Sequence, residues 1–157
     1  AAIYHGAGSG TNQIVLAKNR QLSAWEKPYP VKVQNTDGTE AKIKHWDPDC
    51  FLMGDTYYAI TGNSSREAFD GEEPDRAYLF RSKDLLHWEY MHPFYEGGRY
   101  TEGGEDCAVP DFFPLGDRHM LLFASHLLGS QYYLGRLEGD EFHPRVVLFP
   151  QFLLFQV

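Results

Sequence analysis

An internal repeat limits how this chain of 157 residues can fold. The pattern Pro-Asp-x-Phe-x-x-Gly-Asp occurs at residues 48–55 and again at residues 110–117, a shift of 62 positions. An apolar and aromatic run follows each copy, at residues 57–60 and 120–123. Because self-similarity at a fixed period marks a fold assembled from one repeated supersecondary unit, we expect this chain to stack similar units.

A second pattern recurs with nearly the same period. Residues 22–26 and 85–89 both read Leu-x-x-Trp-Glu, 63 positions apart, and each follows a strand-like stretch, at 14–17 and 77–80. The β-branched and aromatic content of these stretches favours strands. Each unit is therefore predicted to be a small antiparallel sheet of about four strands, with the Trp packed under its last turn.

The Gly-Asp pair inside each copy of the first pattern predicts a hairpin. Gly54 and Gly116 stand between two β-prone runs, where glycine can adopt the positive φ of a tight turn. Small antiparallel sheets repeated radially make a β-propeller. The predicted fold is therefore all-β: a partial β-propeller with about two to three four-stranded blades.

The predicted number of blades indicates how much of a propeller domain the chain contains. A propeller needs roughly four to eight blades to close, and the chain has room for fewer. Strand-like residues stand at both ends, at 1–5 and 152–155. We therefore expect residues 1–157 to be an internal fragment of a single β-propeller domain.

The loops in front of the two hairpins carry many carboxylates. Asp47 precedes the first hairpin, and Glu105 and Asp106 precede the second. Because the two repeats superpose, both loops should enter their sheets from the same end and bring Asp47 and Glu105 to neighbouring positions. Glycoside hydrolysis requires two such carboxylates, one to donate a proton and one to stabilise or attack an oxocarbenium-like centre. Trp46 is a candidate to stack on a sugar ring or to shield the site from water.

Departures from the repeat single out these acids. Asp49 and Asp111 occupy equivalent places, which indicates a shared structural task, the binding of backbone amides at each strand start. Asp47 instead aligns with Val109, and Glu105 has no acidic counterpart. The alternative for both is a structural one, since acids at loop entries mostly cap turns or face solvent.

Composition argues against several other classes. The 14 Lys and Arg against 22 Asp and Glu give a net charge of -8, which repels a nucleic-acid backbone. The apolar stretches are too short to span a bilayer, so no membrane partner is expected. Cys50 and Cys107 are expected to be unpaired thiols. The seven His residues show no metal-ligand spacing, so neither a metal nor a cofactor is expected.

The sequence resembles glycoside hydrolase family 32, the invertases, levanases and inulinases. Trp46-Asp47-Pro48 is similar to the family's Arg-Asp-Pro motif, and residues 105–113 are similar to its Glu-Cys-Pro-Asp motif. The likeness continues to about residue 144, so residues 146–157 are expected to be an atypical tail.

This resemblance implies a five-bladed propeller and retaining hydrolysis of β-fructofuranosides of the sucrose, levan or inulin type. Glu105 would be the general acid/base, with a raised pKa, and Asp47 the transition-state stabiliser. Trp46 and Asp106 would contact the substrate.

Three departures from the family's pattern matter. Trp46 replaces an Arg, which removes a charged sugar contact. Asp106, Ala108 and Val109 expand the Glu-Cys-Pro spacing, so Asp106 competes with Glu105 for the acid role. The Asn-Asp-Pro-Asn-Gly-like motif that carries the family's nucleophile does not occur in these 157 residues. Because a retaining enzyme needs that second carboxylate, the chain by itself is not expected to hydrolyse a fructan.

Two other functions remain open. A related five-bladed glycosidase acting on arabinose- or xylose-containing glycans also uses three propeller carboxylates. A non-catalytic carbohydrate-binding propeller would keep the fold and lose the chemistry, so that it would bind sugar with or without Glu105. All three hypotheses give the chain a carbohydrate partner, and a purely structural repeat protein is the alternative that does not.

Overall fold

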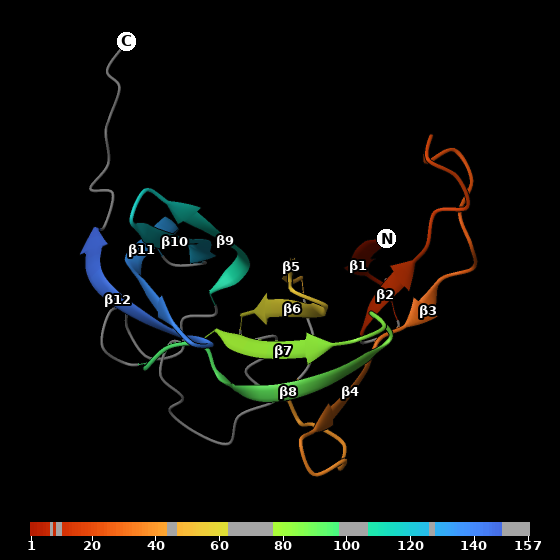
Figure 1. Ribbon diagram of the computed structural model, residues 1–157, viewed down its shortest axis with the longest axis horizontal. Helices are drawn as coiled ribbons and strands as arrows, with labels where there is room; N and C mark the ends of the chain where they lie inside the picture. The colour runs from red at the N-terminus through yellow and green to blue at the C-terminus, as the bar shows by residue number, and fades with distance from the viewer. Residues whose placement is uncertain are drawn as a thin grey trace.

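A computed structural model describes residues 1–6, 8, 11–43, 47–62, 77–97, 107–125 and 128–148. These residues form three β-sheets that fan out from the region where strands β1, β5 and β9 lie (Figure 1). No helix occurs among the described residues, and so none that is long and apolar enough to cross a membrane. The all-β partial propeller predicted from the repeat is confirmed.

Each sheet is built from consecutive strands. The first sheet, in the order β1-β2-β3, contains β1 (Ala2–His5), β2 (Asn12–Val15) and β3 (Tyr29–Pro30). The second sheet, in the order β4-β8-β7-β6-β5, contains β4 (Lys32–Asn35), β5 (Asp49–Met53), β6 (Thr56–Thr61), β7 (Tyr78–Ser82) and β8 (His87–Pro93). The third sheet, in the order β12-β11-β10-β9, contains β9 (Ala108–Leu115), β10 (Arg118–Ser125), β11 (Gly129–Glu138) and β12 (Glu141–Leu148).

The second sheet has one strand more than the expected four. Its antiparallel unit β5–β8 is extended by β4, which pairs in parallel with β8, Lys32 opposite His87 and Asn35 opposite Tyr90. Half-buried Val33 of β4 packs against the buried cluster around Trp88. An unpaired edge strand is a liability, and β4 covers the outer edge of β8.

The backbone repeats as the sequence does. Gly54 and Gly116 have φ of 61° and 63° and turn the β5–β6 and β9–β10 hairpins, as predicted. Leu22 and Leu85, which begin the two copies of the second pattern, are both left-handed, with φ of 56° and 69°. A non-glycine residue seldom adopts positive φ, so the shared conformation is strong evidence that the copies are structural equivalents.

The two tryptophans of the second pattern differ in burial. Trp88 is fully buried and its indole N–H donates a hydrogen bond to the carbonyl oxygen of Leu85, 2.8 Å away. This confirms the expected packing under the last turn. Trp25 is 39% exposed, so the same packing does not occur in the first sheet.

The main core lies between the second and third sheets. Successive side chains of a strand point to opposite faces, so Ile60 and Leu79 face the third sheet while Ala59 and Phe80 pack on the other side. The main core consists of Ile60, Ala77, Leu79, Phe94, Tyr95, Cys107, Leu121, Phe123, Tyr133 and Phe142. Both cysteines are free, as predicted. This shared core fixes the second and third sheets against each other.

The C-terminal part of the fold differs from expectation. The tail expected from Val146 onward begins within β12, where Val146, Val147 and Leu148 pair with Leu134, Tyr133 and Tyr132 of β11. A β-branched, apolar segment of this kind favours a strand, so Val146–Leu148 belongs to the third sheet.

Candidate functional site

The two acidic segments of the sequence, residues 45–49 and 102–107, lead into neighbouring strands. β5 and β9 are the edge strands of the second and third sheets, and β9 contacts both β5 and β6. Asp47 stands two residues before β5, and Glu105 three residues before β9. Trp46, Glu105 and Asp106 lie outside the described residues, so their roles stay predictions.

Asp47 is the predicted site residue that the structure describes. It is half-buried and has a left-handed backbone, with φ of 39°. Val109, its equivalent by the 62-residue shift, has φ of 44°. Aspartate is among the residues that tolerate this conformation, whereas a β-branched residue rarely does. The backbone is therefore left-handed at equivalent positions of the repeat, just before β5 in one copy and at the second residue of β9 in the other.

The third sheet absorbs its extra residue in a β-bulge. Leu122 pairs with Asp111 and Ala124 pairs with Ala108, so three steps along β9 match two steps along β10. Val109, exposed and left-handed, lies inside this bulge. The bulge coincides with the expanded Glu-Cys-Pro spacing of the sequence. Bulges are frequent beside active sites because they change the direction of nearby side chains.

Cys107 anchors the start of this segment. Its side chain is completely buried in the core between the second and third sheets, and its φ is 44°. A buried residue two positions after Glu105 thus fixes the start of the β9 segment in the main core.

A hydrogen bond joins the two inner strands directly. The backbone N–H of Phe112 on β9 donates to Oδ2 of Asp49 on β5, with a nitrogen–oxygen distance of 2.8 Å. The rings of Phe51 and Phe112 lie 6.1 Å apart beside it. The sequence predicted that Asp49 binds backbone amides, but not that one of them belongs to the next sheet. Among the described residues exposed Asp111 makes no such bond.

The surroundings of Asp49 raise its pKa. Burial is the largest cause, opposed by the hydrogen bond from the Phe112 amide, and the negative charge of Asp111 raises the pKa further. The backbone amide of Cys50 has a smaller, lowering effect. Carboxyl groups with perturbed pKa values are frequent at functional sites.

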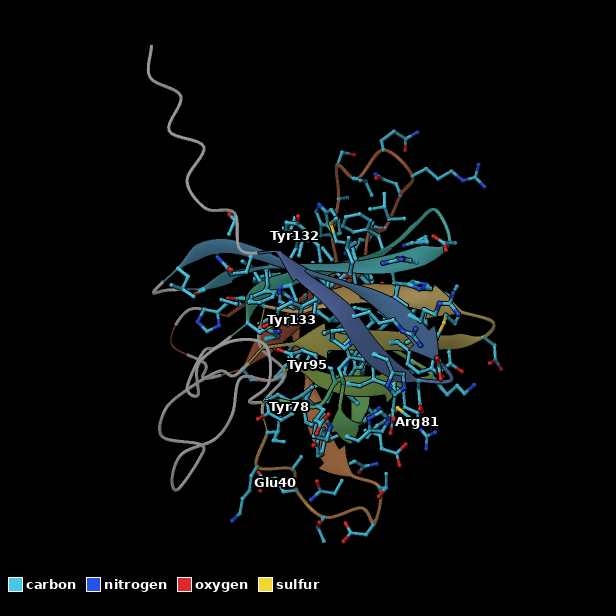
Figure 2. The ribbon with its side chains drawn as sticks, turned by 90° about the vertical axis from the view of Figure 1, so that its left-hand side faces the viewer. Glu40, Tyr78, Arg81, Tyr95, Tyr132 and Tyr133 are labelled. Atoms are coloured by element: carbon cyan, nitrogen blue, oxygen red, sulfur yellow. The ribbon has the colours of Figure 1, made fainter. Side chains whose placement is uncertain are left out.

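A pair of buried tyrosines between the second and third sheets was not found from the sequence. Tyr133 lies on β11 and Tyr95 follows β8; both are labelled in Figure 2. Their rings meet edge to face at 5.4 Å within the main core. The abundance of aromatic residues was the only signal, and it carries no information on position.

A groove of about 370 Å³ lies elsewhere, at the hairpin end of the second sheet. β7 carries Tyr78 at its first residue and Arg81 near its other end, and Figure 2 shows the two apart accordingly. Arg81 pairs with Glu89, Lys83 with Asp55, and Asp84 with His87. The groove is lined by Gln34, Thr56, Tyr58, Arg81, Ser82, Lys83, Asp84, His87 and Glu89. It is therefore a polar surface distant from Asp47. In the described part of the chain, no three acidic, His or Cys side chains gather as metal ligands would.

We compared the chain with models of protein families, with curated proteins and with solved structures. The model of the glycosyl hydrolases family 32 N-terminal domain matches residues 2–152. No curated protein matches the chain.

Solved structures share the fold at low sequence identity. A family 32 β-fructofuranosidase from Bombyx mori is 19% identical, with a TM-score of 0.56, and the match covers 88% of this chain and 31% of that one. A variant of that enzyme is described in complex with sucrose. An exo-β-1,3-galactanase from Phanerochaete chrysosporium is 14% identical (TM-score 0.56; coverage 88% and 30%). One from Clostridium thermocellum is 15% identical (TM-score 0.52; coverage 76% and 27%). The chain spans less than a third of each of these proteins.

Proposed function

Because this chain belongs to the glycosyl hydrolases of family 32, we propose that it supplies two of the carboxylates with which a propeller enzyme hydrolyses β-fructofuranosides such as sucrose, levan or inulin. In this proposal Glu105 protonates the leaving oxygen, and Asp47 hydrogen-bonds the fructosyl hydroxyls as positive charge develops at the anomeric carbon. Trp46 and Asp106 contact the sugar.

The observation that carries the proposal is the joining of β5 and β9. Asp47 stands two residues before β5 and Glu105 three residues before β9, and the Asp49–Phe112 hydrogen bond links the two strands at 2.8 Å. In this proposal the acid/base and the stabilising carboxylate act on the same fructosyl unit, so the strands that follow them must be held firmly beside each other. The buried aromatic core around Cys107 and Tyr133 supplies that rigidity.

We further propose that residues 1–157 are part of one propeller catalytic domain. The nucleophile motif of the family is not among these residues, so the chain alone is expected to bind a fructoside without releasing fructose. Where a longer chain supplies the nucleophile, Glu105→Gln is expected to abolish turnover.

Calorimetric titration of the 157-residue chain with sucrose tests this proposal, beside an assay of fructose release from sucrose, inulin and levan. Asp47→Asn is expected to weaken sucrose binding at least tenfold, because it replaces a charged carboxylate, whose two oxygens both accept hydrogen bonds from the fructosyl hydroxyls, by a neutral amide with one acceptor oxygen. Asp117→Asn, a change at an exposed acid in the β9–β10 turn, is the matched control and should bind normally.

Other outcomes would redirect the assignment. Binding of an arabinoside or xyloside but of no fructoside would keep the propeller and discard the substrate. Sugar binding that is indifferent to both Asp47→Asn and Glu105→Gln would favour a non-catalytic carbohydrate-binding module. Fructose release by the 157-residue chain would show that a nucleophile lies within it.

A further inference from the structure

The hydrogen bond between the inner strands β5 and β9 comes from one side chain. Polar contacts farther out between the second and third sheets include the backbone bond from the Phe142 N–H to the carbonyl of Phe94 and the contact of His92 Nε2 with the Asp140 carboxylate. On the inner side, the Asp49 carboxylate accepts the N–H of Phe112.

This bond satisfies a backbone group that has no strand partner. β9 is an edge strand paired only with β10, so alternate N–H groups along it point away from the sheet. A half-buried N–H without a partner costs free energy comparable to a lost hydrogen bond. Asp49 provides the missing acceptor at Phe112 and thereby takes the place of a neighbouring strand.

The packing around the bond leaves little room for slippage. The ring of Phe112 meets that of Phe94 edge to face at 4.9 Å and that of Phe142 at 5.2 Å, and it stacks on His119 at 5.1 Å. A shift of one residue along β9 would turn Phe112 away from this cluster, because successive strand side chains point to opposite faces. The bond and the ring cluster thus define one register between β5 and β9.

From these contacts we infer that Asp49 is a positioning residue. Its carboxylate sets the register of β9 against β5, and this register in turn sets the distance between Asp47, which precedes β5, and Glu105, which precedes β9. This inference rests on the proposed function of those two acids. Asp49 stands two residues after Asp47, and its partner strand begins three residues after Glu105. A change in register at the bond therefore moves one acid relative to the other.

The ionisation of Asp49 offers a direct signature of the bond. Asp111 on β9 is the charged group that acts on the Asp49 carboxylate, and Cys50 is its neighbour on β5. Burial and the charge of Asp111 raise the pKa of Asp49 above that of an ordinary aspartate, against the effect of the Phe112 amide. The amide proton of Phe112 should therefore report a titration displaced upward in pH.

Nuclear magnetic resonance of the 157-residue chain tests the bond. In the unmodified chain, the Phe112 amide proton should shift with pH at a midpoint above that of a free aspartate, and Asp49→Asn should remove this titration. Asp49→Ala should accelerate hydrogen exchange of the Phe112 amide at least tenfold. Asp49→Asn should restore most of the protection, because its amide oxygen still accepts. Asp111→Ala, at the equivalent repeat position, should leave the protection unchanged.

Sucrose titration of the same variants tests the positioning role. Asp49→Ala is expected to weaken sucrose binding about as much as Asp47→Asn does, with Asp49→Asn and Asp111→Ala close to the unmodified chain. If the Phe112 amide ignores both pH and Asp49→Ala, the inference is overturned. It is equally overturned if the amide responds while Asp49→Ala binds sucrose normally, and the proposed function then stands. If the Phe112 amide responds to pH and to Asp49→Ala but the unmodified chain binds no fructoside, the proposed function fails. The role of Asp49 is then only to join β5 and β9.

Should Asp49→Ala fail to fold, the pH titration of the unmodified chain and its absence in Asp49→Asn still decide whether the bond exists. Sucrose affinity of Asp49→Glu then decides its consequence, because this variant keeps the carboxylate but displaces it by one methylene group. Asp49→Glu should bind sucrose at least tenfold more weakly than the unmodified chain. Equal affinity in the two chains would refute the positioning role.

Discussion

Asp47 and Val109 share a left-handed backbone, with φ of 39° and 44°, although one is an acid proposed to bind sugar and the other an exposed valine in a bulge. The turn is thus a property of the repeated unit, and each copy has placed a different residue in it. Aspartate fits such a turn at little cost, whereas valine is strained there.

We predict that Val109→Gly raises the free energy of unfolding, by about 1 kcal/mol, because it relieves the strain of a β-branched residue at positive φ. Urea denaturation of the two chains measures the difference. Val33→Gly, in β4, is the control and should lower stability, since Val33 packs against a buried cluster in ordinary strand geometry. Equal losses in the two variants would show that Val109 is unstrained.

Gly135→Ala should destabilise the chain by about 2–3 kcal/mol, as expected for overpacking. A Cβ at Gly135 would overlap the backbone carbonyl of His143 and approach the ring of Phe142 to 2.8 Å. Gly139→Ala is the matched comparison, because nothing lies within 4 Å of its Cβ and only its φ of 66° is unfavourable. Its cost should be about 1–2 kcal/mol. Thermal unfolding that ranks the two variants in the opposite order would contradict the close approach of β11 and β12 at this point.

Replacement of the Trp by Ala in the two copies of the Leu-x-x-Trp-Glu pattern should lower the free energy of unfolding by unequal amounts. Trp88→Ala removes a fully buried ring and its bond to Leu85, and should cost about 3–5 kcal/mol. Trp25→Ala removes a ring that is 39% exposed and should cost less than about 1 kcal/mol. Chemical denaturation of both variants measures this contrast. Similar losses would mean that Trp25 is buried in solution.

The lowered pKa of Asp84 predicts that the chain loses stability as the pH falls into the acid range. Burial favours its neutral form, but hydrogen bonds from the ring and backbone of His87 and from the Leu86 amide outweigh burial and lower the pKa of Asp84 to about 2. Because this pKa lies below that of the unfolded chain, Asp84 stabilises the fold above roughly pH 4 and loses that effect as the pH falls toward 2.

Asp84→Ala should therefore be less stable than the unmodified chain at pH 7, and the gap should narrow steadily between pH 5 and pH 2. Urea unfolding at several pH values measures this difference in the free energy of unfolding between the two chains. Asp117→Ala, at an acid that is 82% exposed, serves as the control and should show a small gap that changes little with pH. A gap for Asp84→Ala that is constant with pH would exclude the hydrogen-bonded carboxylate.

The elements that sequence reasoning anticipated are those whose determinants are local. The hairpins at Gly54 and Gly116 follow from a glycine between β-prone runs, and the repeat then transfers one unit's architecture to the next. Asp47 was identified for a similar reason, because it interrupts a pattern that is otherwise kept.

What sequence reasoning missed depends on distant partners. β4 reads Lys-Val-Gln-Asn, in which only Val33 favours a strand, and nothing local says that it pairs in parallel with β8. The acceptor role of Asp49 toward Phe112 requires two sheets to meet, and the Tyr95–Tyr133 contact likewise joins residues that are far apart in the sequence. Glu105, Asp106 and Trp46 lie outside the described residues and remain predictions.

The parallel pairing of β4 has a consequence for how the chain is made. Lys32 leaves the ribosome 55 residues ahead of His87, its partner in the sheet. During synthesis β4 must therefore wait, tethered to the first sheet through Val31, until the hairpin of β7 and β8 has emerged. Such a non-local pairing slows folding and leaves an exposed strand while it is pending. A nascent chain that stalls between these two strands therefore exposes β4 without its partner and is open to aggregation.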